Sequence, residues 1–146
     1  MVAGLAAAGV RRRASILDSG EQITDSEPDD CDVCPAGRWI IDPDGAVVRA
    51  GLVRHYGARH RLWQLDPNIA YLSGDTLPEG IRGFEVLEAL PFDERRLRQA
   101  LNALDCGALE ILVRGVQVDP DALRRRLRPH ACAGGYGRVA AARCRW

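Results

Sequence analysis

The chain has 146 residues, which is enough for one domain with a hydrophobic core of its own. Its 47% hydrophobic and 27% charged residues are typical of a globular protein, and no apolar run approaches the roughly 20 residues of a membrane span, so we expect no membrane association. The formal net charge of zero provides no general attraction to polyanions.

The opening segment reads MVAGLAAAGVRRR, with its apolar stretch before its arginines. A secretory signal has the opposite order, so we expect a cytoplasmic protein. Residues 1–17 are short enough to be one strand or the end of a larger preceding unit. Residues 18–37 are acidic, rich in Ser, Pro and Gly, and without hydrophobic period, which predicts a linker or long loop. We therefore place a boundary near residue 37.

The first helix is expected within residues 42–62. Asp42 can cap the free backbone N–H groups, Pro43 suits the first helical position, and Asp44 complements the helix dipole. Apolar residues then recur every four positions at Val48, Leu52 and Tyr56, which predicts one buried side.

Two strands and a second helix are expected next. An apolar segment at 69–72 ends in a turn at 73–75, and residues 83–92 form a strand that Pro91 stops. The clearest helix lies within residues 92–104, with Asp93 as cap and Phe92 five residues before Leu97 as a hydrophobic staple.

The last third of the chain is expected to hold a central strand and a third helix. Residues 108–115 are a nearly unbroken apolar run, as in a strand covered on both faces. A helix then starts at Asp119 and Pro120. After Pro129 the sequence has little strand character. We therefore predict an α+β fold with a small mixed sheet, two or three helices and a missing last strand, followed by an irregular tail over 129–146.

Arginines gather in the third predicted helix and just after it. Leu123 and Leu127 share one side of this helix, which directs Arg125 to the opposite side and makes it an i, i+4 neighbour of Asp121. Two interpretations remain open: a solvated helix face whose charges complement the helix C-terminus, or a surface that contacts RNA phosphates. The candidate RNA-binding residues are Arg124, Arg125, Arg126 and Arg128. Charge is uneven along the chain as a whole, with nine acidic residues and one arginine in 18–45 against seven arginines and two aspartates in 119–146.

The residues capable of catalysis or metal binding form no recognisable constellation. Cys31 and Cys34 make a single CxxC in an acidic loop, whereas structural zinc needs four ligands; His130, Cys132 and Cys144 match no standard spacing. His55 and His60 are five residues apart, so we interpret them as helix-surface histidines. We therefore predict no catalytic, cofactor-binding or metal-binding residues. Four aromatic residues lie near arginines in the first half and could form a stacking platform or a core: Trp39, Tyr56, Trp63 and Tyr71.

Several blocks of the chain resemble a known family when they are taken together in order. The blocks are GRWIIDPDGAVVRAGLVRHYGARHRLWQLDPNIAYLSGD, RGFEVLEALPF, LRQALNALDCGALEILVRG and VDPDALRRRL. They resemble the THUMP-like domain at the C-terminus of actinobacterial class I S-adenosylmethionine-dependent methyltransferases. The resemblance covers about residues 38–128, and residues 1–17 resemble the end of the preceding methyltransferase domain.

The resemblance implies an accessory, non-catalytic domain that presents RNA to a methyltransferase domain. S-adenosylmethionine would be a cofactor of the full-length family and not of this chain. Two alternatives remain: a protein-interaction module that uses the sheet surface left by the absent strand, or a truncated or frameshifted gene product without independent function.

Overall fold

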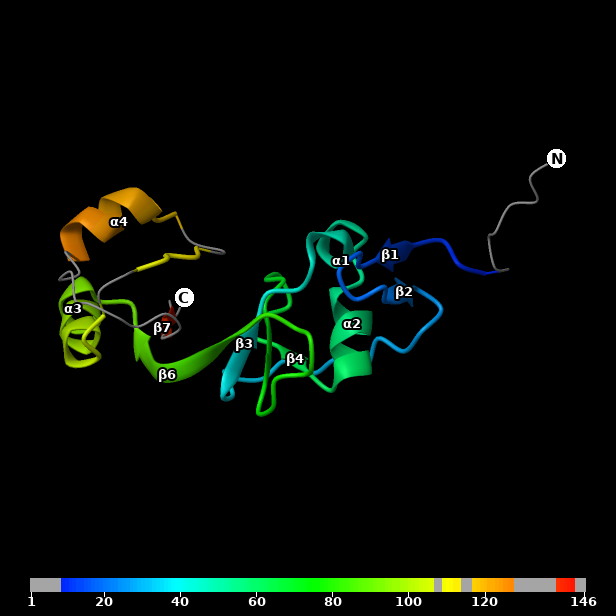
Figure 1. Cartoon of the computed structure of the whole chain (residues 1–146), viewed down its shortest axis with the longest axis horizontal. Coiled ribbons are helices and arrows are strands. Elements are labelled where there is room, and N and C mark those ends of the chain that lie inside the picture. Colours follow the sequence, from blue (N-terminus) through cyan, green and yellow to red (C-terminus); the bar gives the residue numbers. More distant parts are fainter. Residues whose placement is uncertain (1–8, 107–108, 114–116, 128–138, 144–146) are drawn as a thin grey trace. The chain divides into compact units, whose positions relative to one another are not determined.

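The computed structural model describes residues 9–106, 109–113, 117–127 and 139–143 (Figure 1). The chain divides into two compact units, Met1–Gly83 and Phe84–Trp146. Helices and strands occur in both units, as expected for an α+β fold. The described residues form four α-helices, one more than the upper expectation from the sequence.

The first unit begins with a hairpin of β1 (Arg13–Ser15) and β2 (Gln22–Thr24). The two strands are antiparallel, with Ala14 opposite Ile23, and both of these side chains are buried. The segment 18–37 therefore contains a strand, and our interpretation of it as a linker or loop was wrong over these residues. The composition of residues 18–37 does not predict β2, because this strand is stabilised by pairing with β1 and its own sequence has little strand propensity.

The acidic segment is also fastened to the helix that follows it. The Arg59 guanidinium donates hydrogen bonds to the Glu21 carboxylate at 2.9 Å and to the Gln22 carbonyl at 2.8 Å, and it pairs with Glu27. The His60 ring shares a hydrogen bond of 2.9 Å with Glu21. These contacts place the segment in the fold of the first unit.

The rest of the first unit is a three-stranded sheet with two short helices. The strands are β3 (Trp39–Ile41), β4 (Trp63–Gln64) and β5 (Leu72–Gly74), and β5 pairs antiparallel with both of the others. The helices are α1 (Gly45–Arg49) and α2 (Val53–His60). Their core contains five fully buried side chains: Ile23, Ile41, Val47, Leu52 and Leu72.

The single helix expected within 42–62 is two helices. Gly51 has φ of +67°, a left-handed conformation that interrupts the helix between α1 and α2. The cap is Asp44, whose side chain accepts from Ala46 N at 2.7 Å, and not Asp42. The break also changes the buried side: Leu52 and Tyr56 are buried, but Val48 is exposed.

The turn expected at residues 73–75 begins later. Ser73 and Gly74 belong to β5, and Ser73 is fully buried. Its hydroxyl accepts from Gly37 N at 2.9 Å and donates to the Trp39 carbonyl at 2.7 Å. Ser73 thus fastens the chain before β3 to the sheet, and this role uses both hydrogen-bonding functions of the hydroxyl.

The second unit contains β6 (Gly83–Pro91), α3 (Glu94–Ala103), α4 (Pro120–Leu127) and β7 (Val139–Arg143). Strand β6, which starts at the last residue of the first unit, ends at Pro91 as expected. The prediction for α3 is confirmed as well, because the Asp93 side chain accepts from Arg96 N at 2.8 Å and Phe92 packs on the same cluster as Leu97.

Two expectations for the second unit were wrong. Residues 109–113, in the run predicted as a central strand, contain no strand, and Leu112 is 43% exposed. The last strand is not missing, because β7 pairs in parallel with β6, with Ala142 opposite Leu90. Tertiary pairing overrides the weak strand propensity of an Ala-rich sequence, so the tail over 129–146 is not irregular throughout.

Candidate nucleic-acid interface

Helix α4 carries the described arginines of the predicted RNA-binding cluster, and its start follows from Asp119 and Pro120. The Asp119 side chain accepts from Asp121 N at 2.9 Å and from Ala122 N at 3.2 Å, and Pro120 occupies the first helical position. These two hydrogen bonds, together with the charges of Arg125 and Arg126, hold the pKa of Asp119 below its usual range. The cap therefore stabilises the helix at neutral pH and is lost only as the pH falls through this lowered pKa.

The apolar side of α4 packs on α3. Leu123 is 3% exposed and Leu127 is 2% exposed, and both belong to a cluster with Leu97, Ala100 and Leu101 of α3. Packing this side against α3 leaves the arginines on the exposed sides of α4, as the hydrophobic period predicted. Arg128 lies outside the described residues.

Two of the three described arginines have intramolecular partners. Arg124 pairs with Asp121 at 2.7 Å and also donates from Nε to the Leu109 carbonyl at 3.2 Å. Arg126 donates from Nε to both Glu94 oxygens at 3.0 Å. The expected pair between Asp121 and Arg125 does not form, because Asp121 contacts the i+3 arginine instead. Among the described residues, Arg125 makes no ion pair.

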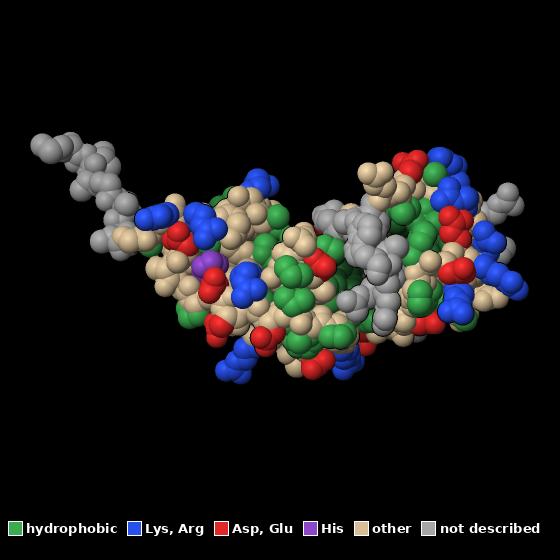
Figure 2. Space-filling view, turned by 180° about the vertical axis from the view of Figure 1, so that it is seen from behind, with side chains coloured by type: hydrophobic (Ala, Val, Ile, Leu, Met, Phe, Trp, Pro, Cys, Tyr) green, Lys and Arg blue, Asp and Glu red, His purple; other side chains and the backbone are tan. Residues whose placement is uncertain are grey.

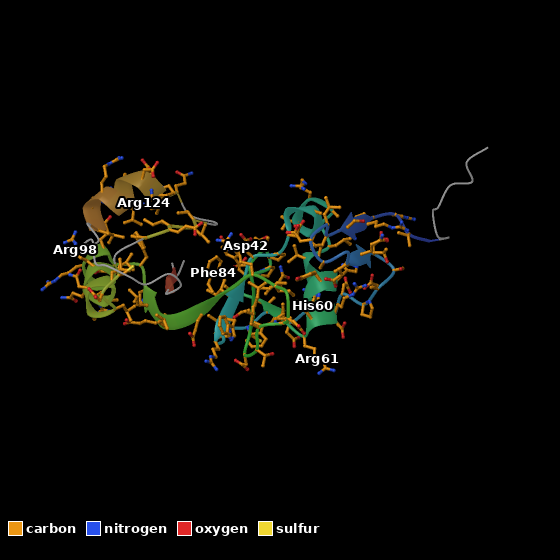
Figure 3. All side chains as sticks on the ribbon, in the orientation of Figure 1. Asp42, His60, Arg61, Phe84, Arg98 and Arg124 are labelled. Carbon is orange, nitrogen blue, oxygen red and sulfur yellow. The ribbon has the colours of Figure 1, made fainter. Side chains whose placement is uncertain are left out.

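Arg126 and Arg98 form reciprocal contacts between the two helices. The Arg126 side chain of α4 binds Glu94 of α3, and the Arg98 side chain of α3 donates to the Arg126 carbonyl at 2.8 Å. Figure 3 labels Arg98 on α3 and Arg124 on α4. The hydrogen bonds that Arg126 donates to Glu94 raise the pKa of Arg126 above its ordinary value. Arg126 therefore has a structural role that its position in a run of arginines did not reveal.

The other candidate groups lie in the first unit. Cys31 is buried and its thiol donates to the Leu62 carbonyl at 3.4 Å, whereas Cys34 is exposed. Burial raises the pKa of the Cys31 thiol, so near neutral pH little of it is in the thiolate form that binds metals or reacts as a nucleophile. Within the described ranges, no group of three or more His, Cys, Asp or Glu side chains is arranged to hold a metal ion. His55 is buried, so our interpretation of it as a surface histidine was wrong.

The aromatic residues of the first half form no common exposed platform. Tyr56 and Tyr71 are buried. In the register of the sheet, Trp63 is opposite Ser73 and Trp39 is opposite Gly74, so the two indoles lie on opposite faces. Figure 2 shows that arginine and acidic side chains are interleaved over the surface of α3 and α4. The arginines of the second unit are therefore the better candidate for a nucleic-acid interface.

Comparison with known families gives a match that falls largely within the second unit. Residues 81–145 match the family described as THUMP domain-like. This match covers 65 of the 146 residues of the chain. The match starts and ends later than the range 38–128 that we expected for the domain. The domain boundaries at 38 and 128 therefore stay a prediction. Because the match extends to residue 145, it gives no support to a frameshift as the origin of the tail.

Related proteins are methyltransferases by name. The chain is 82% identical, over 126 residues and 86% of its length, to two uncharacterized S-adenosylmethionine-dependent methyltransferases of Mycobacterium tuberculosis, from strains CDC 1551 and H37Rv. It spans 35% of the length of these curated relatives. These relatives are actinobacterial, as the resemblance implied.

A solved structure shares the fold. The chain superposes with a TM-score of 0.63 on a protein of Porphyromonas gingivalis W83 that is named only provisionally as a methyltransferase. The two are 20% identical, and the match covers 84% of this chain and 31% of the other. In the described residues, no helix has the length and apolar character required to cross a bilayer.

Proposed function

We propose that the chain is an accessory part of an S-adenosylmethionine-dependent methyltransferase that contacts the RNA substrate and has no catalytic site of its own. The observation that carries the proposal is the state of Arg125, an exposed guanidinium with no ion pair among the described residues. Such a group can bind a phosphate without first breaking an internal contact. The THUMP-like match and the names of the mycobacterial relatives support the context.

The alternative proposal of a protein-interaction module has lost its main argument. It depended on an apolar sheet surface left by an absent strand, whereas β7 pairs with β6. The exposed sides of α3 and α4 are charged, with apolar side chains directed into the cluster between the helices. A charged helical surface is better suited to a polyanion than to an apolar protein partner.

The purified chain is expected to transfer no methyl group to RNA. The reason is that the sequence contains no glycine-rich cofactor turn after a strand. The measurement is incorporation of labelled methyl groups from S-adenosylmethionine into bulk RNA, with the boiled chain as control. Incorporation above that control would refute the accessory role.

The change Arg125→Gln is expected to weaken RNA binding several-fold without loss of stability. Each phosphate contact releases counterions from the RNA when it forms. Loss of one contact should therefore reduce the magnitude of the slope of log affinity against log salt by about 0.7 for single-stranded RNA. The unfolding free energy should change by less than about 0.5 kcal/mol, as at other surface positions. Anisotropy titrations of a short labelled RNA at two salt concentrations measure both the affinity and the slope.

The matched control for this experiment is Arg54→Gln. Arg54 is exposed on α2 in the first unit and, among the described residues, also makes no ion pair. The Arg54→Gln variant loses one positive charge, as Arg125→Gln does, so it controls for the change in net charge. Equal affinities and slopes for the two variants would contradict a role for Arg125.

A further inference from the structure

Helix α3 carries three exposed arginines outside the cluster predicted from the sequence: Arg95, Arg96 and Arg98. The Arg98 side chain of α3 reaches the Arg126 carbonyl of α4, so the exposed sides of the two helices adjoin at this contact. From Asp93 to Ala103 and from Asp119 to Leu127, six arginines accompany four carboxylates, which leaves a net charge of +2. This local excess contrasts with the neutral chain as a whole.

The four carboxylates are all occupied within the helices. Asp93 and Asp119 accept backbone hydrogen bonds at the two helix starts, Glu94 binds Arg126, and Asp121 binds Arg124. In the part of the chain that the structure describes, the remaining arginines of the two helices make no ion pair. They are Arg95, Arg96, Arg98 and Arg125. The net charge of +2 is therefore the charge of these four arginines less that of the two capping aspartates.

Arg98 differs from the other three because it is held in place. One N–H of its guanidinium donates to the Arg126 carbonyl at 2.8 Å, in the last turn of α4. A guanidinium has five N–H donors, so this contact leaves donors for a ligand. A fixed guanidinium loses less conformational entropy on binding than a mobile one, and its planar fork matches two phosphate oxygens.

Helix geometry separates the other two arginines of α3. Arg98 and Glu94 both contact Arg126, so they mark the side of α3 nearest to α4. Arg95 is three residues before Arg98 and is its neighbour along the helix surface. Arg96 is displaced from Arg98 by about 160° around the helix axis and lies on the side away from α4. Arg125 points away from the apolar side of α4.

We infer that Arg95 and Arg98 of α3 join Arg125 of α4 in one phosphate-binding surface for the RNA backbone. The inference rests on the proposed function, which it extends from α4 to a second helix. The described sides of α3 and α4 expose guanidinium groups and no aromatic ring, since Phe92 packs on the apolar cluster. The surface therefore binds phosphodiesters without reading the bases, and affinity should be independent of sequence.

The test compares Arg95→Gln/Arg98→Gln with Arg96→Gln in the full chain. The probe is a short fluorescein-labelled single-stranded RNA, followed by anisotropy at two salt concentrations. Loss of two phosphate contacts should weaken binding about tenfold and lower the salt slope by about 1.4, with the same change for an RNA of unrelated sequence. Arg96→Gln removes a similar exposed charge from the far side of α3 and should stay within about twofold of wild type.

The single variant Arg95→Gln separates RNA binding from folding, because Arg95 makes no contact between the two helices, whereas Arg98 does. It should lower the slope by about 0.7 and leave the thermal melt unchanged. Equal binding by the double variant and Arg96→Gln, in a chain whose affinity does respond to Arg125→Gln, would overturn the α3 assignment and leave the proposed function standing. Absence of RNA binding by the wild-type chain would overturn both, as would equal binding of an acidic polypeptide.

Discussion

Replacing Leu127 with alanine is expected to lower the free energy of unfolding by about 2 to 5 kcal/mol. Leu127 is 2% exposed and ends the apolar side of α4, where it packs in the cluster with Leu97, Leu101 and Leu123. Alanine would remove most of this side chain and leave a cavity between α3 and α4. The cluster contains only six buried side chains among the described residues, so little remains to compensate for the loss.

Urea denaturation followed by far-ultraviolet circular dichroism measures this effect. The control is Leu112→Ala, because Leu112 belongs to the same unit but is 43% exposed, and its loss should cost less than about 0.5 kcal/mol. A similar midpoint for the two variants would show that α4 does not depend on the packing of Leu127. RNA titrations should be interpreted only for variants whose midpoint matches wild type.

Alanine at position 57 is expected to destabilise the first unit by about 1 to 3 kcal/mol, although alanine favours helices. Gly57 is buried in α2, and in an exposed helix the same change would stabilise by about 1 kcal/mol. Here an added Cβ would lie 2.6 Å from the Cys31 sulfur and 3.3 Å from Leu72 Cδ2. The steric cost therefore outweighs the gain in helix propensity.

Two further variants test whether the contact with Cys31 is the cause. Gly45→Ala is the control, because its Cβ would meet the movable end of the Arg49 side chain, and thermal melting should show little change. In Gly57→Ala/Cys31→Ala the clash with sulfur is removed, so the double variant should lose less stability than the sum of the single variants. Additive losses would place the cause elsewhere, for example at Leu72.

The elements predicted correctly are those whose signals are local. Asp93 and Asp119 cap α3 and α4, and both helices have apolar residues at helical spacing within one short segment. The elements missed depend on distant partners. Strand β2 lies in acidic sequence and pairs with β1, while β7 is rich in alanine and pairs with β6. An apolar run such as 109–113 is compatible with several structures, and here it forms no strand.

The candidate interface could be predicted only in part for the same reason. The sequence located the arginines of α4 and the outward direction of Arg125. It could not show that Arg126 binds Glu94, because 32 residues separate the two positions. Nor could it select Arg98, whose acceptor is a backbone carbonyl in another helix. The run of arginines therefore combines a structural residue with a candidate ligand-binding residue.

The contacts of Arg126 with Glu94 and Arg98 also limit which substitutions related sequences can tolerate at these positions. Arg126 approaches Glu94 with two guanidinium nitrogens, Nε at 3.0 Å from both carboxylate oxygens and Nη2 at 2.9 Å from one of them, a planar fork that the single ammonium group of lysine does not reproduce. A change at position 94 would remove the carboxylate that Arg126 binds, and a change at position 126 would remove the guanidinium that Glu94 binds. Arg98 is less constrained, because its acceptor is a carbonyl that every residue type provides. In related sequences, positions 94 and 126 should thus covary, whereas position 98 can change alone.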